Sequence, residues 1–322
     1  MKSATAIAHP NFALIKYWGK SNLSGNIPAM SSLAITLDSM ISETTVSFPD
    51  DLKQDTWILN EVEQPSLGQI QLPFDHLRKV SPFNKPCLIE SKNNFPTAAG
   101  LASSASGIAS LVTALDNALE IKLSSPQMVE NAMLGSGSAA RSLFPGFVLL
   151  DVTENAVTCE TILEAEEWPL NVIVCITSTN EKKISSRRGM EISRKTSPMY
   201  SDWVSNHQED MEFALQAIRA KNFHQLGKIS EQNCLKMHNV MKTSQPSINY
   251  WNQATHACVD NVKDMQRKGM PIFFTIDAGP QVKIVCEPDV SKDVLLIMEK
   301  VPGVQAIIGS NLGKGARIVH EQ

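Results

Sequence analysis

The chain has 322 residues, of which 43% are hydrophobic and 19% are charged, and its formal net charge is −4 at pH 7. This composition is typical of a folded globular protein and excludes a disordered chain. The acidic balance gives no basis for a nucleic-acid partner or for binding to an anionic membrane surface. The length favours two domains over one.

Features that would direct the chain out of the cytoplasm are missing from the sequence. Residues 1–10 lack the apolar core of a secretory signal, and no stretch approaches the ~18 consecutive apolar residues that span a bilayer. The cysteines are scattered and none forms a C-x-x-C pair, which argues against a disulfide framework or a zinc site. We therefore expect a reduced, cytoplasmic protein.

The first hundred residues are predicted to be mostly β-structure. Residues 4–16 are expected to form one strand, residues 31–37 and 41–48 two strands joined by a short turn, and residues 86–91 a further strand. This last strand leads directly into a segment rich in glycine, alanine and serine.

That segment, residues 94–107, begins with turn residues and ends in small side chains before a helical pattern over 108–119. The N–H groups at a helix start lack intrahelical partners and carry partial positive charge, so a phosphate chain is a natural ligand. The alternative is a helix start packed tightly against a neighbouring element. The Ser103 and Ser104 hydroxyls can donate to such a phosphate or coordinate a metal that it carries.

Three basic side chains in the first half admit two interpretations each. A helix predicted over 125–134 is followed by a second glycine–serine cluster that holds Arg141. Its guanidinium matches a carboxylate or phosphate bidentately, or is simply solvated. Lys16 and Lys20 flank an aromatic pair, either as an ordinary surface or as the cationic mouth of an anion site.

A hairpin over 147–152 and 158–163 precedes a composition shift at 164–169, which predicts domains 1–168 and 169–322. The second half is predicted as a two-layer α+β unit. Its expected elements are a buried strand 170–177, two helices within 201–242 broken near 221–222, a helix 251–267, strands 272–276 and 282–286, a helix 290–300, and closing strands 304–308 and 316–319.

Two segments of the second half contain charged residues that the sequence pattern alone does not assign to a site. Residues 181–190 contain four basic residues within seven, a pattern usual for a solvated, mobile loop. Asp277 ends an apolar strand just before Ala-Gly-Pro, where it is either a turn former or a catalytic base.

Five blocks of sequence together resemble the mevalonate diphosphate decarboxylase family of the GHMP kinase superfamily, in its order and at its spacing. They are residues 13–20, 94–107, 135–144, 185–190 and 275–280. The resemblance implies the α+β GHMP kinase fold, with a ribosomal-protein-S5-like N-terminal domain that carries the ATP loop. A ferredoxin-like C-terminal domain follows, and the substrate lies in the cleft between the two.

The resemblance also implies a reaction. With ATP and Mg²⁺, mevalonate 5-diphosphate is phosphorylated on its C3 hydroxyl and then loses phosphate and carbon dioxide to give isopentenyl diphosphate. Because relatives are commonly homodimers, we expect a homodimer. Mevalonate 3-kinase and a related mevalonate-phosphate decarboxylase are the alternative activities, and a non-catalytic nucleotide-binding homologue is the alternative from another class.

The family's functional residues carry over by position. Asp277 is expected to be the general base, Lys16 to keep it ionised, and Arg141 to grip the substrate carboxylate. The other expected substrate contacts are Ala13, Tyr17, Lys20, Ser136, Ser138, Ser186 and Arg187. The expected ATP contacts are Asn94, Ala99, Gly100, Leu101, Ala102, Ser103, Ser104 and Ala105, with magnesium reaching Ser103 and Ser104 through the phosphates.

Four residues depart from the family pattern. Met30 stands where Asn is common, Ala34 where Ser is common, Pro145 where Gly follows Leu-Phe, and Gln281 where Asn follows Ala-Gly-Pro. These changes touch loop geometry and hydrogen bonds near the site. None of them removes a group that the reaction needs.

Overall fold

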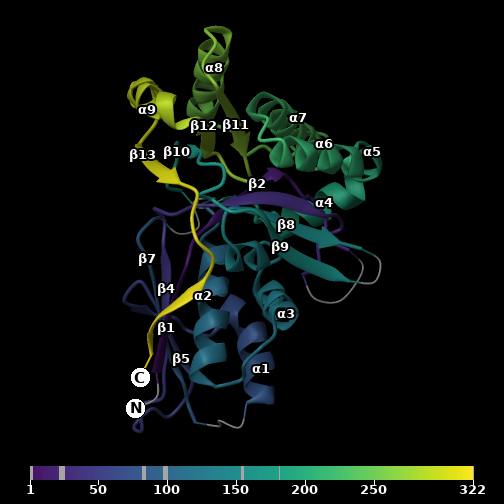
Figure 1. The fold of residues 1–322 in the computed structure, drawn as a ribbon. Coiled ribbons are helices and arrows are strands. Elements are labelled where there is room, and N and C mark those ends of the chain that lie inside the picture. Colours follow the sequence, from purple (N-terminus) through teal and green to yellow (C-terminus); the bar gives the residue numbers. More distant parts are fainter. Residues whose placement is uncertain are drawn as a thin grey trace.

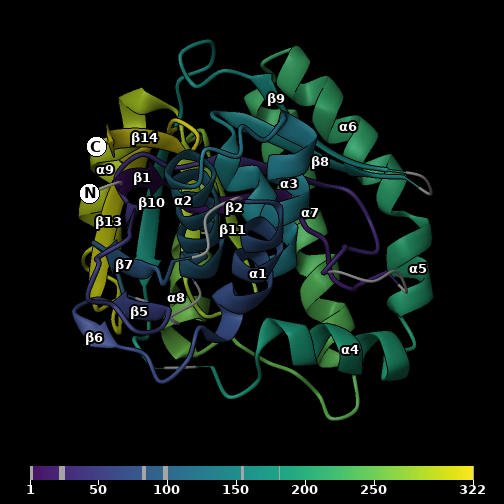
Figure 2. The same cartoon turned by 90° about the horizontal axis from the view of Figure 1, so that it is seen from below.

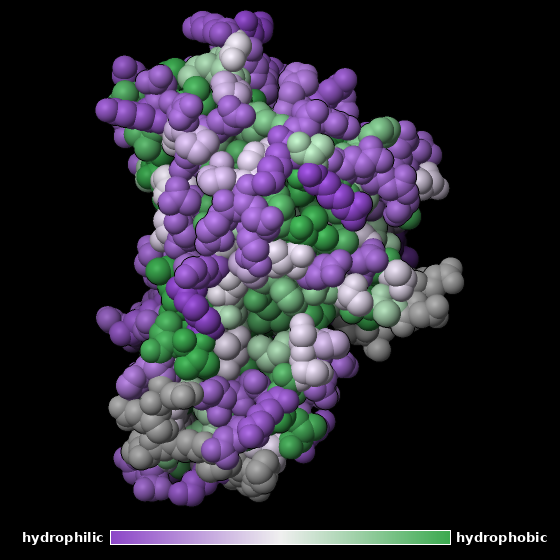
Figure 3. Space-filling model, viewed as in Figure 1, coloured by the Kyte–Doolittle hydropathy of each residue, from purple (hydrophilic) through white to green (hydrophobic). Residues whose placement is uncertain are grey.

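A computed structural model of the protein describes residues 3–21, 26–81, 85–96, 101–153, 156–180 and 182–321. The ribbon has three sheets stacked along one long direction, with helices beside them (Figures 1 and 2). On the face seen in Figure 3, hydrophobic side chains gather mainly at the middle level of the molecule. Within the described residues, no helix is both long and apolar enough to cross a bilayer.

The lower layer in Figure 1 is a sheet in the order β14-β1-β4-β7-β5-β6, with the helices α1, α2 and α3 on one face. Hydroxyl pairs join helix to sheet, because Ser106 and Ser110 of α2 bond Ser42 and Thr44 of β4 at 2.7 and 2.8 Å. The bounds are β1 (Ser3–Ala8), β4 (Ser42–Ser47), β5 (Thr56–Leu59), β6 (Val62–Glu63), β7 (Leu88–Asn93), β14 (Arg317–Glu321), α1 (Gln71–Val80), α2 (Ser103–Ala118) and α3 (Ser125–Gly135).

The middle layer is an antiparallel sheet in the order β2-β3-β8-β9. Every residue of β2 (Asn11–Ile15) and β3 (Ser32–Thr36) is buried, so the end of β2 lies deep inside the molecule. The hairpin expected over 147–163 is confirmed as β8 (Phe147–Val152) and β9 (Val157–Leu163). A short 3₁₀ helix, η2 (Ala139–Leu143), precedes it.

The upper layer is a sheet in the order β11-β12-β10-β13, in which β10, β11 and β12 are almost wholly buried. Val172 and Val174 of β10 pack into the same core as Met211 of α6, whereas Ile173 and Cys175 pack with Val262 of α8. This two-sided burial explains why β10 is a continuous apolar run. The bounds are β10 (Asn171–Ile176), β11 (Ile272–Ile276), β12 (Val282–Cys286), β13 (Ala306–Asn311), α6 (His207–Arg219), α7 (Phe223–Lys242), α8 (Gln253–Arg267) and α9 (Ser291–Met298).

Several local expectations need correction. Residues 4–16 form two strands because His9-Pro10 interrupts them, and proline cannot donate to a ladder. Strands β3 and β4 are consecutive but belong to different sheets. The basic segment 181–190 is not wholly a loop, because α4 (Ser186–Thr196) begins within it, capped by Ser185, and is followed by the short α5 (Tyr200–Ser205).

The end of the chain also departs from expectation. Strand β14 does not close the second half: it runs back and pairs antiparallel with β1, with Ile7 opposite Arg317 (Figure 1). The return path passes close to the middle sheet, since a Cβ added at Gly313 would lie 1.9 Å from the Leu37 carbonyl oxygen. The division of the chain at residue 168 stays a prediction.

Candidate active site

Asp277 and Lys16 form an ion pair between the ends of two buried strands. Lys16 directly follows β2 and Asp277 directly follows β11. Lys16 Nζ lies 2.6 Å from Asp277 Oδ1 and also donates to the Ala13 carbonyl oxygen at 2.6 Å. Because only 2% of the Lys16 side chain is exposed, the reading of Lys16 as a surface lysine is wrong. Asp277 is thus more than a turn former.

Lys283 of β12 supplies a second ammonium group, which lies 3.1 Å from Asp277 Oδ2. Burial by itself would raise the Asp277 pKa, but Lys16 and Lys283 outweigh it and hold that pKa well below its ordinary value. Sequence reasoning missed Lys283. The available signal in the sequence is a lysine within the apolar run 282–286, and the structure places this lysine opposite Thr275 of β11.

Arg141 is buried, with 4% of its surface exposed, so the solvated alternative is wrong. Its Nε donates to Asn11 Oδ1 at 2.9 Å and its Nη1 to Ser32 Oγ at 2.8 Å. The guanidinium also lies over the Tyr17 ring, 5.7 Å from the centroid. Neither of these two hydrogen bonds uses Nη2. The Arg141 guanidinium is held by one side chain of β2 and one of β3.

The glycine–serine cluster brings Tyr17 against small side chains. Ser136 and Ser138 hydroxyl oxygens lie 3.2 Å apart, and the Ser138 side chain is hydrogen-bonded to Tyr17. A Cβ at Gly137 would lie 2.8 Å from the Asn26 carbonyl oxygen and 3.1 Å from Tyr17 Oη. Glycine is therefore required at this position for the loop to approach the ring so closely.

The family resemblance implies that Tyr17, Lys20, Ser186 and Arg187 contact the substrate diphosphate, and two of these, Lys20 and Arg187, converge on Asn26. Asn26 Oδ1 accepts from Lys20 Nζ and, at 3.1 Å, from Arg187 Nη2, so one amide gathers two cations. Ser186 Oγ accepts from Lys182 Nζ at 3.1 Å. Asn26 is another residue that sequence reasoning missed, since it sits in an unremarkable polar loop between distant partners.

The expected ATP loop is described only in part. Ala99 and Gly100 lie outside the described residues. Ala102 adopts a left-handed conformation with φ 59°, α2 starts at Ser103, and no described side chain caps the helix. An uncapped helix start favours an anionic ligand. The Asn94 amide bonds the backbone of Ser39 and Ile41 at 3.0 and 2.8 Å, and its contact with ATP stays a prediction.

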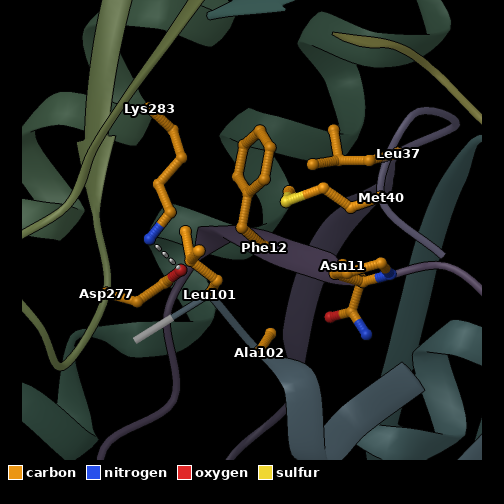
Figure 4. A pocket seen from close by; sticks show the side chains of 9 residues that line it. Asn11, Phe12, Leu37, Met40, Leu101, Ala102, Asp277 and Lys283 are labelled. Carbon is orange, nitrogen blue, oxygen red and sulfur yellow. Dashed lines mark ion pairs between the residues drawn. The ribbon is translucent and has the colours of Figure 1, made fainter. Parts of the chain in front are cut away.

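One narrow cavity joins this loop to the ion pair. Leu101 and Ala102 line it together with Asp277 and Lys283, and Phe12, Leu37 and Met40 add apolar surface (Figure 4). Asp277 and Lys283 point toward each other across this space. The expected phosphate loop and the expected base therefore face the same small volume.

Magnesium suits the oxygen donors present. Hard oxygen ligands are the ones that Mg²⁺ prefers, and it is commonly held between substrate phosphates and a few protein oxygens. Ser103 and Ser104 in the first turn of α2 offer hydroxyl oxygens beside the uncapped backbone. Among the residues that the structure describes, no group of three or more His, Cys, Asp or Glu is placed to hold a metal ion.

Helix α7 holds the backbone on both sides of the ion pair. Asn233 Oδ1 accepts from the Lys16 backbone N–H at 2.7 Å, and its amide nitrogen donates to Asp210 Oδ2 of α6 at 2.8 Å. The neighbouring Cys234 sulfur bonds both the N–H and the C=O of Ile276, at 3.3 and 3.4 Å. Two adjacent residues of one helix thus position the ends of β2 and β11.

Comparison with known proteins identifies the family of this chain. Residues 8–161 match the diphosphomevalonate decarboxylase-like N-terminal domain, and residues 172–317 match the mevalonate 5-diphosphate decarboxylase C-terminal domain. Diphosphomevalonate decarboxylase of Candida albicans is 31% identical, over 100% of this chain and 99% of that protein. This chain belongs to the diphosphomevalonate decarboxylase family.

Solved structures of the diphosphomevalonate decarboxylase family share the fold. The Staphylococcus aureus mevalonate diphosphate decarboxylase is 35% identical with a TM-score of 0.90, over 99% of this chain and 98% of that one. MDDEF in complex with MVAPP, AMPPCP and magnesium is 35% identical with a TM-score of 0.91, over 99% of each chain. The expected α+β GHMP kinase fold is thereby confirmed.

The structure gives packing roles to three of the positions that depart from the family pattern. Gln281 is buried, accepts from the Thr177 N–H at 2.7 Å and donates to the Ser178 carbonyl at 2.6 Å. Met30 packs in the cluster that contains Trp18, and Ala34 pairs with Ala13 between β3 and β2.

Proposed function

We propose that this protein is an ATP-dependent diphosphomevalonate decarboxylase, converting mevalonate 5-diphosphate to isopentenyl diphosphate with release of ADP, phosphate and carbon dioxide. The observation that carries the proposal is the ion pair between buried Lys16 and partly buried Asp277, which faces the start of α2 across one cavity in a chain of this family. A tertiary hydroxyl is a weak nucleophile, so a carboxylate beside its proton is the chemical requirement.

In the first step, Asp277 accepts the C3 hydroxyl proton while the new O–P bond forms and ADP leaves with the electrons of the broken bond. Phosphoryl transfer depends mainly on positioning and on charge neutralisation. The backbone at the start of α2 would hold the nucleotide phosphates. Bound magnesium, held by Ser103 and Ser104 together with those phosphates, would supply further neutralising charge.

In the second step, the tertiary phosphate departs with the C–O electron pair. The bond from C2 to the carboxylate carbon then breaks, and its electrons form the new double bond as carbon dioxide leaves. Arg141 would grip the carboxylate until that moment, with its orientation set by Asn11 and Ser32. The held guanidinium keeps the breaking C–C bond aligned with the leaving phosphate.

The diphosphate of the substrate would bind where Lys20, Asn26 and Arg187 meet. Lys20 and Arg187 converge on Asn26, and an incoming diphosphate offers both cations more charge than the neutral amide does. Ser186 and Tyr17 complete the contacts that the family resemblance predicts. The small residues Ala13, Ser136 and Ser138 are the remaining expected contacts with the substrate.

A product assay tests this proposal. Purified protein with Mg-ATP would be offered mevalonate, its 5-phosphate and its 5-diphosphate separately, and ADP, phosphate and carbon dioxide would each be counted. We expect equal release of all three from the diphosphate alone. ADP without carbon dioxide would indicate a mevalonate 3-kinase, and turnover of the monophosphate would indicate a related decarboxylase.

A homodimeric state and a cytoplasmic location remain proposals. The six buried cysteines, all free thiols, support a reducing compartment. Sedimentation of the purified protein and fractionation of cells test the two points separately.

A further inference from the structure

Lys283 stands on the same face of the upper sheet as the reacting groups. It pairs in register with Thr275 of β11, and cross-strand partners share one face of a sheet. Thr275 Oγ1 reaches the Ala13 carbonyl oxygen at 3.3 Å, so this face looks toward the end of β2. The ammonium group of Lys283 is consequently aimed at Asp277 from the strand next to β11.

The two cations on Asp277 are held differently. Lys16 Nζ makes contacts of 2.6 Å to both Asp277 Oδ1 and the Ala13 carbonyl, which fixes it to the end of its own strand. Lys283 contacts the other carboxylate oxygen at the longer distance of 3.1 Å. Lys283 also lines the cavity that is lined by Leu101 and Ala102, the two residues that directly precede α2. Lys16 is thus tied to the end of β2, and Lys283 borders the space in which phosphate would arrive.

This double pairing creates a chemical difficulty. A general base works best when its pKa lies near the working pH, yet two ammonium groups hold the Asp277 pKa far below that range. The apolar walls from Phe12, Leu37 and Met40 strengthen the pairing further, since charges attract more strongly away from water. Asp277 becomes a stronger base if one of its two cations is drawn to another acceptor.

We propose that Lys283 is a catalytic residue with two successive acceptors: Asp277 Oδ2 before phosphoryl transfer, and the oxygens of the transferring phosphoryl group during it. This inference rests on the proposed function. The ammonium keeps its proton throughout and forms no covalent bond. The proton of the C3 hydroxyl goes to Asp277, the new bond joins C3–O to phosphorus, and ADP leaves with the electrons of the old bond. One lysine thereby strengthens the base and neutralises the phosphoryl charge in the same step.

The experiment measures single-turnover ADP formation and substrate binding in Lys283→Met, Lys283→Gln and Lys283→Arg, beside wild type. The exposed Lys292, also in the second half, gives the matched control Lys292→Met. We expect ADP formation to fall about 10²–10³-fold in the Met and Gln variants, as for loss of one oriented charge-stabilising group. Mevalonate 5-diphosphate should bind within about threefold of wild type, and Lys283→Arg should recover part of the rate.

A double variant separates catalysis from mere support of Asp277. If Lys283 acts on the phosphoryl group, adding Lys283→Met to Asp277→Asn lowers the remaining rate further. If the second substitution costs nothing, Lys283 acts only through Asp277 and the proposal is overturned. It is also overturned if Lys283→Met and Lys283→Gln keep wild-type rates, or if they lose binding alone. Wild type that forms no ADP would instead remove the proposed function, and this inference with it.

Discussion

The backbone N–H of Lys16 donates to Asn233 Oδ1 at 2.7 Å, so a side chain of α7 holds the strand end that carries the lysine. Asn233 is itself held by Asp210, and Asp210 is paired with Lys236 at 2.7 Å. This chain of hydrogen bonds runs from Lys236 on the surface of α7 to the buried backbone of Lys16, the partner of the proposed base. The position of the Lys16–Asp277 pair therefore depends on residues that touch no substrate.

Replacing Asn233 with alanine is expected to weaken catalysis without removing a reacting group. The change leaves the buried Lys16 N–H unpaired, which costs about 1–3 kcal/mol of the free energy of unfolding. We expect a lower kcat with KM nearly unchanged, measured by steady-state kinetics beside urea denaturation. Asn261→Ala in α8, which removes only a bond to the Ala257 carbonyl, is the control. A wild-type kcat in Asn233→Ala would show that the hydrogen bond from the Lys16 N–H to Asn233 is not needed for catalysis.

Replacing Asp277 with asparagine removes the proposed base while keeping the shape of the side chain. We expect kcat to fall about 10²–10⁴-fold, the range usual for a general base. Binding of mevalonate 5-diphosphate, measured by calorimetry, should be largely kept. Asp260→Asn on the exposed face of α8 should leave both quantities unchanged. Turnover within about tenfold of wild type would contradict the general-base assignment.

Replacing Arg141 with lysine keeps the positive charge but loses the parallel N–H donors of the planar guanidinium. A lysine cannot bond Asn11 and Ser32 while it also presents two parallel donors to a carboxylate. Loss of charge-assisted hydrogen bonds of this kind predicts a fall in kcat/KM of about 10–100-fold. The exposed Arg188→Lys serves as the control. Equal kinetics for the two variants would argue against carboxylate recognition by Arg141.

Acidification is expected to destabilise the fold through its buried histidines. Burial lowers the pKa of His238 to about 3, and burial also lowers the pKa values of His9 and His207. Because these folded-state pKa values lie below the unfolded value of about 6.5, the unfolded chain binds more protons at acidic pH. Stability is complete above pH 6.5 and is lost as pH falls from there toward the folded-state values.

For His238 alone, the expected slope is about 1.4 kcal/mol per pH unit between pH 6 and pH 3. Urea denaturation at several pH values measures it, and His238→Gln should reduce the slope by that amount. His224→Gln, at an exposed position of α7, should leave the slope unchanged. Asp277 adds to this slope only below about pH 4, because its pKa is lowered from an unfolded value near 3.9, so the His238 contribution is read between pH 6 and pH 4.

The local features of this protein were readable from its sequence, because caps, breakers and periodicity act over a few residues. The helix starting after Ser124 was predicted from Ser-Ser-Pro, and the structure shows a capping box between Ser124 and Gln127. The break near residue 221 appears as the gap between α6 and α7. The positions of Asp277 and Arg141 followed from the family's motif spacing, although their catalytic roles remain predictions.

Only the tertiary structure decided which distant residues meet. Lys16 and Asp277 are 261 positions apart, and nothing local to either one specifies their 2.6 Å contact. Lys283 joins them through the register of β12 against β11, and β14 reaches β1 because the chain returns from the upper sheet to the lower one. Strand register and helix docking depend on how complete faces pack together, which short-range patterns do not encode. The amino-acid sequence alone thus determined the elements and the family motifs, whereas packing of the three layers determined the charge balance at Asp277.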